Sequence, residues 1–259
     1  MRSPTLIALG IFIGFHSQIA FAGNTHNGKI PQIVYWQGDA NHQKIALTFD
    51  DGPHPEYTGR ILDILAEKNV KATFFVTGKR VEKYPELARR IVSDGHVIGN
   101  HGYSHHEMKL MSRKRIREEI RQGQSVIREV TGESTTIFRP PYGMFSRAVV
   151  AELREAGHRL IQWSLSPKDW AHPREQVIVK RVLTRARSGS IILLHDSHPH
   201  KESGNREQTV KALPKLIEAL QSKGFYLVTV PDLLKAEPSV LATSDILPDH
   251  VASNETVVQ

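Results

Sequence analysis

The chain alternates between short apolar runs and longer stretches in which apolar residues recur at a helical spacing. This alternation begins near Lys44 and continues to about Val230. Repeated strand–helix units of this kind form parallel sheets covered by helices. The apolar runs predict seven strands, at Ile45–Phe49, Ala72–Val76, His96–Gly99, Thr136–Phe138, Leu160–Trp163, Ser190–Leu194 and Tyr226–Val230. The helical spacing predicts helices at 58–68, 85–94, 112–131, 146–156, 174–187 and 207–222.

Small residues mark the ends of several predicted helices. A glycine, which suits the left-handed backbone that often ends a helix, follows five of them, at Gly95, Gly132, Gly157, Gly189 and Gly224. Ser112 and Ser146 are candidate N-caps. No linker, repeat or low-complexity segment interrupts residues 41–235, so we expect one α/β domain with a barrel-like parallel sheet. We expect residues 23–40 to be a loose lead-in and residues 236–259 to be a weakly ordered tail.

The first 22 residues differ from the rest of the chain. Arg2, the apolar run Leu6–Phe15 and the sequence Ala20-Phe21-Ala22 together predict a secretory signal that is cleaved near Ala22. His16 ends the apolar run, which is therefore short for a membrane span of about 20 residues. An uncleaved membrane anchor is the alternative. We therefore expect a secreted or periplasmic protein without stable insertion in a membrane.

Composition and charge narrow the range of partners. The 259 residues are 39% hydrophobic and 24% charged, as in an ordinary globular protein. The formal net charge of +7 would fall to +6 on loss of Arg2, and it suits an anionic wall polymer or membrane surface. A generally basic, solvated surface is the simpler explanation. The cations are scattered, with only residues 113–115 clustered, so we expect no nucleic acid partner.

The chain has no cysteine and 14 histidines. The lack of cysteine excludes disulfides, thiolate zinc sites and cysteine nucleophiles. Any metal site must therefore be built from His, Asp and Glu side chains.

Polar residues follow several of the predicted strands, where the active site of a parallel α/β fold forms. They are Asp50-Asp51 after the first strand, His101 and His105 after the third, Arg139 after the fourth, Asp169 after the fifth and His195 after the sixth. Since the carboxyl ends of parallel strands lie at one rim of the sheet, we expect these side chains to converge.

The first of these groups points to a divalent cation. Adjacent carboxylates at the end of a buried strand repel each other, and a cation would relieve that repulsion. His101 and His105 could supply two imidazoles and Asp51 a carboxylate. Such a set leaves zinc an open position for water, which is the catalytic arrangement. An ordinary core or surface role is the alternative for the two histidines, and His106 is a spare candidate ligand.

The remaining groups can complete a hydrolytic site. Zinc lowers the pKa of a bound water to about 7, and Asp50 could accept its proton as a general base. Arg139 could pair with Asp50 and hold it ionised, a role compatible with a plain salt bridge. A backbone N–H in the turn at Tyr142 could stabilise the developing oxyanion. His195, oriented by Asp169, could protonate the leaving group.

These residues lie in five ordered motifs, which are Thr48–Pro53, His101-x-x-x-His105, Arg139–Tyr142, Asp169-Trp170 and Leu193-x-His195. From about residue 44 to 230 the chain resembles the polysaccharide deacetylase family, also called the NodB homology domain or carbohydrate esterase family 4. The resemblance implies a deformed (β/α) barrel that uses a metal to remove acetyl groups from N-acetylated, and sometimes O-acetylated, glycans.

The resemblance also implies a role for each residue. The base, its partner, the acid and the support of the acid would be Asp50, Arg139, His195 and Asp169. The ligands of Zn²⁺, or of another divalent metal such as Co²⁺, would be Asp51, His101 and His105. The residues at the substrate would be Pro140, Tyr142 as oxyanion donor, and Trp170 and Leu193 as walls of the acetyl pocket.

Two positions depart from the family pattern. Gly102 stands where the family commonly has Ser or Thr, a hydroxyl that steadies the loop before His105. Ser166 stands where the family usually has Asp, three residues before the Asp169-Trp170 pair. Neither departure removes a ligand, the base or the acid, so we expect activity to survive.

The sequence favours an N-deacetylase acting on N-acetylglucosamine-type units, in peptidoglycan or chitin oligomers. We expect it to act as a monomer. An O-acetyl esterase on acetylxylan-like glycans is the first alternative, because the same site could attack either carbonyl. A catalytically inactive glycan-binding protein is the second, but it predicts the loss of a group that this chain retains.

Overall fold

The computed structural model of the chain describes residues 33–201 and 203–235. The predicted signal at 1–22, the predicted tail at 236–259 and the first part of the predicted lead-in lie outside these residues. No helix within 33–201 and 203–235 combines the length and apolar character needed to span a membrane.

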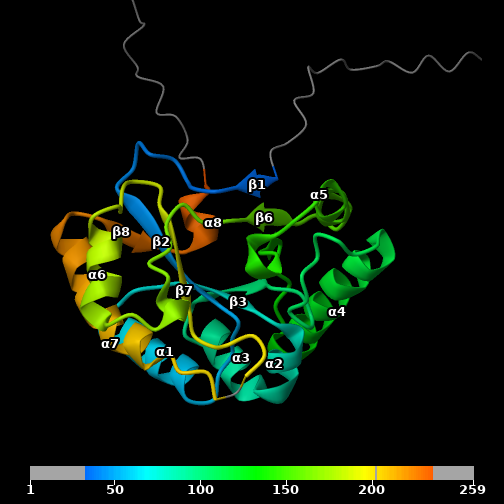
Figure 1. Cartoon of the computed structure of the whole chain (residues 1–259), viewed down its shortest axis with the longest axis horizontal. Helices are drawn as coiled ribbons and strands as arrows, with labels where there is room; N and C mark the ends of the chain where they lie inside the picture. Colours follow the sequence, from blue (N-terminus) through cyan, green and yellow to red (C-terminus); the bar gives the residue numbers. More distant parts are fainter. Residues whose placement is uncertain (1–32, 202, 236–259) are drawn as a thin grey trace, which may run out of the picture. The chain divides into compact units, whose positions relative to one another are not determined.

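Strands and helices alternate along the described chain (Figure 1). The strands are β1 (Val34–Tyr35), β2 (Lys44–Asp50), β3 (Thr73–Val76), β4 (Val97–Asn100), β5 (Ile137–Phe138), β6 (Arg159–Ile161), β7 (Ile191–His195) and β8 (Tyr226–Val228). The α-helices are α1 (Tyr57–Glu67), α2 (Gly78–Lys83), α3 (Pro85–Ser93), α4 (Arg113–Thr131), α5 (Arg147–Glu155), α6 (Glu175–Leu183), α7 (Glu207–Ser222) and α8 (Val230–Leu233). Two short 3₁₀ helices are η1 (Pro141–Gly143) and η2 (Asp169–Ala171).

The strands form one parallel sheet in the order β1-β6-β5-β4-β3-β2-β7. The central strand β2 also pairs with β8 through its first residues, Lys44–Ala46. Two single bridges connect the β7 edge of the sheet to segments near its β1 edge. Ile192 of β7 pairs with Leu165, which follows β6, and Ser190, just before β7, pairs with Gln37, which follows β1. The sheet therefore curls into an irregular barrel, as the family resemblance implies.

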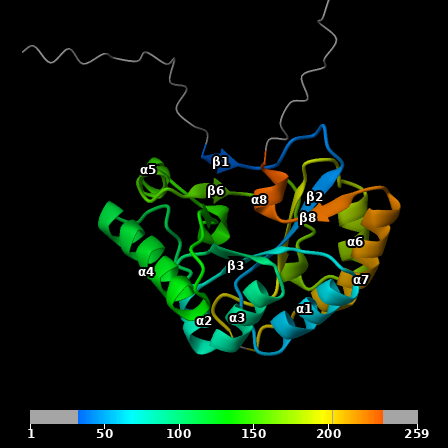
Figure 2. The same cartoon turned by 180° about the vertical axis from the view of Figure 1, so that it is seen from behind.

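Three apolar clusters hold this barrel together. In Figures 1 and 2, helices α1–α4, α6 and α7 lie around the outside of the strands. The largest cluster joins strand residues such as Leu47 to helical residues such as Leu62 and Leu216. A second cluster joins α4 and α5 to β5 and β6. The third includes alternate strand residues such as Ala46 together with Val230 and Leu233.

The last cluster shows how α8 closes one end of the barrel. The backbone N–H of Val230 donates to the Thr73 hydroxyl at the start of β3, at 2.9 Å. Because α8 caps the end where the parallel strands begin, the opposite end, at their carboxyl termini, is the one left for a site.

The structure confirms the predicted α/β barrel-like fold and differs from the sequence prediction in details. Residues Val34–Tyr35 form β1 in the segment expected to be a loose lead-in, which brings the described sheet to eight strands. Helices α2 and α8 were not predicted. Ser112 and Ser146 both occupy N-cap positions, but only the Ser112 side chain accepts a backbone N–H there.

Candidate active site

The predicted site residues converge at the carboxyl ends of the strands. Strand register places Asp50 of β2 beside His195 of β7. Because β4 and β5 pair at Asn100 and Phe138, the residues that follow, His101 and Arg139, are also neighbours. A pocket of about 500 Å³ opens at this rim, lined in part by Asp50, Asp51, His101, His105, Tyr142, Trp170, Leu193 and His195.

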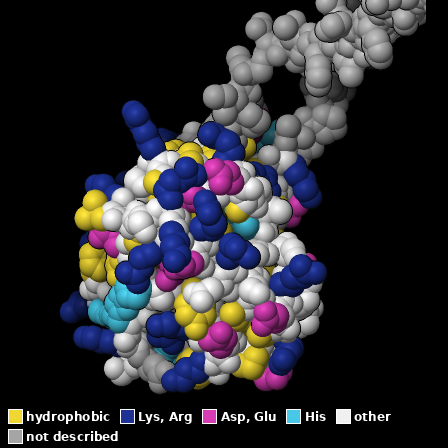
Figure 3. Space-filling view, turned by 90° about the vertical axis from the view of Figure 1, so that its right-hand side faces the viewer, with side chains coloured by type: hydrophobic (Ala, Val, Ile, Leu, Met, Phe, Trp, Pro, Cys, Tyr) yellow, Lys and Arg dark blue, Asp and Glu magenta, His cyan; other side chains and the backbone are white. Residues whose placement is uncertain are grey.

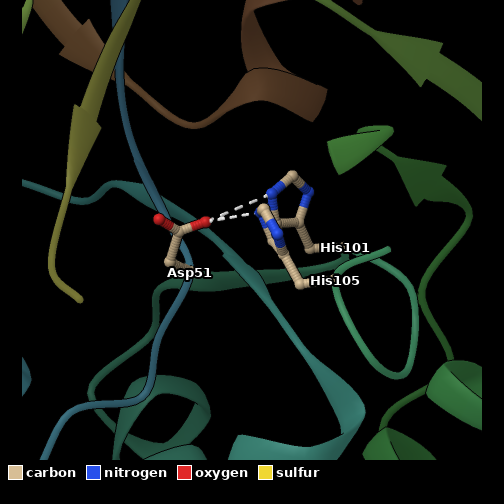
Figure 4. Close-up of side chains that lie close together, drawn as sticks. All are labelled: Asp51, His101 and His105. Carbon is tan, nitrogen blue, oxygen red and sulfur yellow. Dashed lines mark ion pairs between the residues drawn. The ribbon is translucent and has the colours of Figure 1, made fainter. Parts of the chain in front are cut away.

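Asp51, His101 and His105 form a compact set of three potential metal ligands (Figure 4). Asp51 Oδ1 lies 2.9 Å from His105 Nε2 and 3.5 Å from His101 Nε2. All three side chains are buried, and one ligand atom from each lies within 4.8 Å of the others. Two imidazole nitrogens and one carboxylate oxygen at this spacing fit a divalent cation that retains an open position.

The protonation of this set also suits a cation. His101 Nδ1 lies 2.6 Å from the carbonyl oxygen of Arg139. A carbonyl only accepts, so Nδ1 donates there, and Nε2 is the atom left to bind a cation. Burial would raise the pKa of Asp51, but its contacts with the His101 and His105 rings outweigh that effect and hold this pKa well below its usual range. Burial lowers the pKa of His105 despite the opposing effect of Asp51, which favours its neutral, ligating form.

A carboxylate on α4 holds the loop that carries both histidines. Glu119 Oε2 accepts the backbone N–H groups of Tyr103 at 3.0 Å and Ser104 at 2.9 Å, and Oε1 accepts the Ser104 hydroxyl. Gly102 has a φ of +79°, a left-handed conformation that glycine adopts without strain. Its N–H donates to Asn100 Oδ1 at 2.8 Å. The loop is therefore fixed by Glu119 and Asn100 although residue 102 has no hydroxyl.

Asp50 is held apart from the ligand set by Arg139. Its Oδ1 accepts from Arg139 Nη1 at 2.6 Å, whereas Oδ2 lies 3.8 Å from His101 Nε2 on the metal side. The fully buried guanidinium also donates to the Thr48 hydroxyl and to the carbonyls of Ile161 and Gln162. Burial lowers the pKa of Arg139, and the charge of Asp50 opposes that effect. One oxygen of Asp50 is thus tied to a fixed cation while the other faces the pocket.

His195 and Asp169 form the second charged pair. His195 Nδ1 lies 2.8 Å from Asp169 Oδ1, and the His195 backbone N–H donates to Asp169 Oδ2 at 2.8 Å. The Thr209 hydroxyl also donates to Oδ2. Burial alone would lower the pKa of His195, but the charge and hydrogen bond of Asp169 outweigh it and raise the pKa to about 9. His195 is therefore protonated at neutral pH and fixed at the edge of the pocket.

The residues predicted to contact substrate differ in how they lie relative to the pocket. Leu193 is buried in the pocket wall, whereas Trp170 is 53% exposed at its edge. Tyr142, in η1 with a φ of +60°, packs edge-on against His105. Pro140 is buried and is not among the residues lining the pocket, and its carbonyl accepts the Gly143 N–H that shapes η1. A direct contact of Pro140 with substrate therefore stays a prediction.

The segment after β7 contributes a wall that sequence reasoning missed. His198, Pro199 and His200 line the pocket, and His200 Nε2 lies 2.8 Å from the Tyr142 hydroxyl. Buried Arg80 and Arg206 hold this segment through the carbonyls of His198 and Ser197. His198 and His200 follow the carboxyl end of β7, so the strand-end rule that identified His195 could also have identified them. Glu119 carries no such signal, since its contacts depend on how α4 packs.

A buried carboxyl behind the Asp51 turn was also missed. Asp196 accepts from the Thr58 hydroxyl at 2.6 Å, and burial raises its pKa to about 7. A Cβ added to Gly52 would lie 2.1 Å from the Asp196 carboxylate, so only glycine lets the turn pass this close.

Ser166, which stands where the family usually has Asp, still makes a contact within its turn. Its hydroxyl accepts the Lys168 backbone N–H at 3.2 Å.

The chain matches a family model and several known proteins. A family model described as "Polysaccharide deacetylase" matches residues 37–161. A chitooligosaccharide deacetylase of Rhizobium leguminosarum bv. trifolii is 38% identical over 208 residues, which cover 78% of this chain and 97% of the relative.

Solved structures of similar fold include both enzymes and a pseudoenzyme. The chain is similar to the Bc1960 peptidoglycan N-acetylglucosamine deacetylase, with a TM-score of 0.75, 35% identity, and coverage of 78% of this chain and 93% of that one. It is also similar to BA3943, described as a CE4 family pseudoenzyme from Bacillus anthracis, with a TM-score of 0.74, 30% identity, and coverage of 80% and 70%. The catalytic side chains, rather than the fold, must therefore decide whether a protein of this shape is active.

Proposed function

The chain belongs to the polysaccharide deacetylase family, and we propose that it is a metal-dependent enzyme that hydrolyses the N-acetyl groups of N-acetylglucosamine-type glycans. One observation carries this proposal. A three-ligand cation set lies in the same pocket as an arginine-bound carboxylate and a histidine paired with aspartate. Two relatives whose names specify chitooligosaccharide and peptidoglycan N-acetylglucosamine support the choice of substrate class.

The residues Asp51, His101 and His105 would hold the cation, for which Zn²⁺ is our first choice and Co²⁺ a substitute. When bound, such a cation activates water and polarises the acetyl carbonyl. The other steps fall to side chains of the chain itself.

Asp50 Oδ2 faces the ligand set and is the base that accepts a proton from the attacking water. Arg139 keeps Asp50 ionised and fixes its other oxygen. The turn at Tyr142 provides a backbone N–H for the oxyanion that forms on the acetyl oxygen. Leu193 and Trp170 border the space for the acetyl methyl group.

His195 supplies the proton that the departing amine needs. Asp169 holds Nδ1 and raises the pKa of His195 to about 9, so the imidazole is charged at neutral pH. After water has added to the acetyl carbon, transfer of the His195 proton to the amide nitrogen lets the C–N bond break. The products are acetate and the free amine. The acid, His195, and the base, Asp50, are therefore two different groups, and each has its own charged partner.

An O-acetyl esterase acting on acetylxylan-like glycans is the second candidate, because an ester carbonyl fits the same arrangement and an alcohol is a better leaving group than an amine. An inactive glycan-binding protein is less well supported, because the base, the acid and three ligands are all present in the pocket. We further propose that the protein is exported by its first 22 residues and acts as a monomer on wall or oligomeric glycans.

The test is acetate release from N-acetylglucosamine oligomers, peptidoglycan and acetylxylan, each with and without a chelator. We expect release from the first two, loss of release with chelator, and recovery on addition of Zn²⁺. Release from acetylxylan alone would replace the proposal with the esterase. Metal binding without release from any substrate would support the inactive binding protein.

A further inference from the structure

The outward face of α4 carries a line of cations that the catalytic site does not use. The helix buries Ile116, Ile120 and Ile127 against the barrel. On its exposed side, Lys114, Arg121 and Arg128 are seven residues apart. Seven residues are almost two helical turns, so these three side chains lie nearly in line along about 21 Å of helix.

Two other cations on the same helix are already neutralised. Arg113 and Arg117 both bind Glu152 of α5, and Arg113 also binds Glu155. By contrast, none of Lys114, Arg121 and Arg128 has an ion-pair partner among residues 33–201 and 203–235. Their charges therefore remain available to a partner outside the described part of the chain.

This line of charge is narrow. Glu155 borders it on the α5 side, and the helical spacing puts Glu118 and Glu129 on its other side. Figure 3 looks at the side on which α4 lies in Figure 1, and it shows many Lys and Arg side chains spread over this face, with Asp and Glu side chains among them. A flat anionic membrane would also meet the bordering carboxylates, whereas a linear polyanion can follow the cations alone.

A hollow beside the line offers hydrogen-bonding groups. A pocket of about 350 Å³ between α4 and the turn at 156–158 is lined in part by Arg121, Arg128, Ser125 and Ser134. Guanidinium groups bind carboxylates and phosphates through paired hydrogen bonds, and hydroxyl groups pair with sugar hydroxyls. This combination suits a sugar ring that carries an acidic group.

We propose that Lys114, Arg121, Arg128 and the adjoining pocket bind a strand of an acidic polysaccharide, a linear glycan that carries carboxylate or phosphate groups. This surface is formed by the charge and shape of α4 and includes none of the catalytic residues. The surface would hold the protein on an anionic glycan whether or not that glycan is its substrate.

The test measures binding of fluorescently labelled polygalacturonate to the purified protein at low salt, with neutral dextran and phosphatidylglycerol vesicles as comparison probes. The variant replaces Lys114, Arg121 and Arg128 with Gln. A matched control replaces three exposed cations on another side of the domain, Arg185, Arg187 and Lys223, with Gln, and so loses the same net charge. Circular dichroism and acetate release from short N-acetylglucosamine oligomers show whether each variant is folded.

We expect the α4 variant to bind polygalacturonate about tenfold more weakly, with the control within about twofold of the unmodified protein, because only the α4 cations act together. Equal weakening in both variants would overturn the proposal in favour of diffuse surface charge. Failure of the unmodified protein to bind polygalacturonate would overturn it as well. Vesicle binding that depends on the α4 cations, without polygalacturonate binding, would replace the glycan with a membrane.

Discussion

At the scale of single residues, the two carboxylates of Asp50 and Asp51 have different partners although they are adjacent in the chain. Asp50 is held by Arg139 at 2.6 Å, and Asp51 lies 2.9 Å from His105. Both carboxylates line the same pocket, and His101 Nε2 lies 3.5 Å from Asp51 Oδ1 and 3.8 Å from Asp50 Oδ2. The repulsion that makes the pair unusual in sequence is therefore relieved by one cation built into the fold and by a ligand set suited to a second.

The pH dependence of the reaction should follow the Asp169–His195 pair. An acid must be protonated to act, so activity falls as pH rises through the pKa of His195, which Asp169 raises to about 9. A bound cation lowers this pKa, so the informative quantity is the shift between variants. We expect Asp169→Asn to move the basic limb of kcat/KM to lower pH. An unchanged limb would contradict the role of Asp169, and Asp63→Asn, an exposed carboxylate, is the control.

Arg139 should also matter for stability. It is fully buried, and its removal would leave the buried Asp50 carboxylate without its cation. We expect Arg139→Met to lower the free energy of unfolding by about 3–5 kcal/mol, measured by urea denaturation. Adding Asp50→Asn should restore part of that loss, because no uncompensated charge remains. A cost below about 1 kcal/mol for the single variant would show that the pair is not desolvated.

At the scale of elements, the strands that were predicted most directly are those with continuous apolar runs. β2 and β7 are buried on both faces, so their sequences lack polar alternation and stand out. β1 has only two residues and pairs with β6, which lies far along the chain, so nothing local marks it. α2 is short and follows β3 after a single residue, with no apolar periodicity of its own.

The same distinction applies to the site. His101, Arg139 and His195 were predictable because each lies at the carboxyl end of a strand, and parallel strands end at a common rim. Glu119 was not, because its role arises only when α4 packs beside the 101–105 loop. Sequence motifs therefore located the groups at the pocket, while the groups that position them depend on helix packing.

Glu119 gives the prediction that belongs to this scale. Glu119→Ala removes the acceptor for two backbone N–H groups and one hydroxyl in the loop that carries His101 and His105. We expect the affinity for Zn²⁺ to fall about tenfold, as for other residues that orient metal ligands. Competition with a chromophoric chelator measures this affinity. Glu118→Ala, one residue away and exposed, should leave the affinity unchanged. Equal affinities for both variants would show that the loop holds its shape without Glu119.

At the scale of the whole domain, the barrel has two unlike ends. α8 and its apolar cluster close the end where the strands begin, and the polar pocket occupies the end where they finish. The cation line on α4 lies on the outer wall, separate from both. The protein would then use two different surfaces. The cation line on α4 would bind an anionic glycan, and the pocket at the carboxyl ends of the strands would deacetylate its substrate.

The central claim is that Asp51 binds the cation while Asp50 accepts the proton. Zinc content and acetate release, measured together for the Asp50→Asn and Asp51→Asn variants, test it most directly. We expect Asp50→Asn to retain zinc and to lose about a hundredfold or more in turnover, the usual contribution of a general base. We expect Asp51→Asn to lose both zinc and turnover. An Asp50→Asn variant that releases acetate at the unmodified rate, or that loses its zinc, would contradict the account.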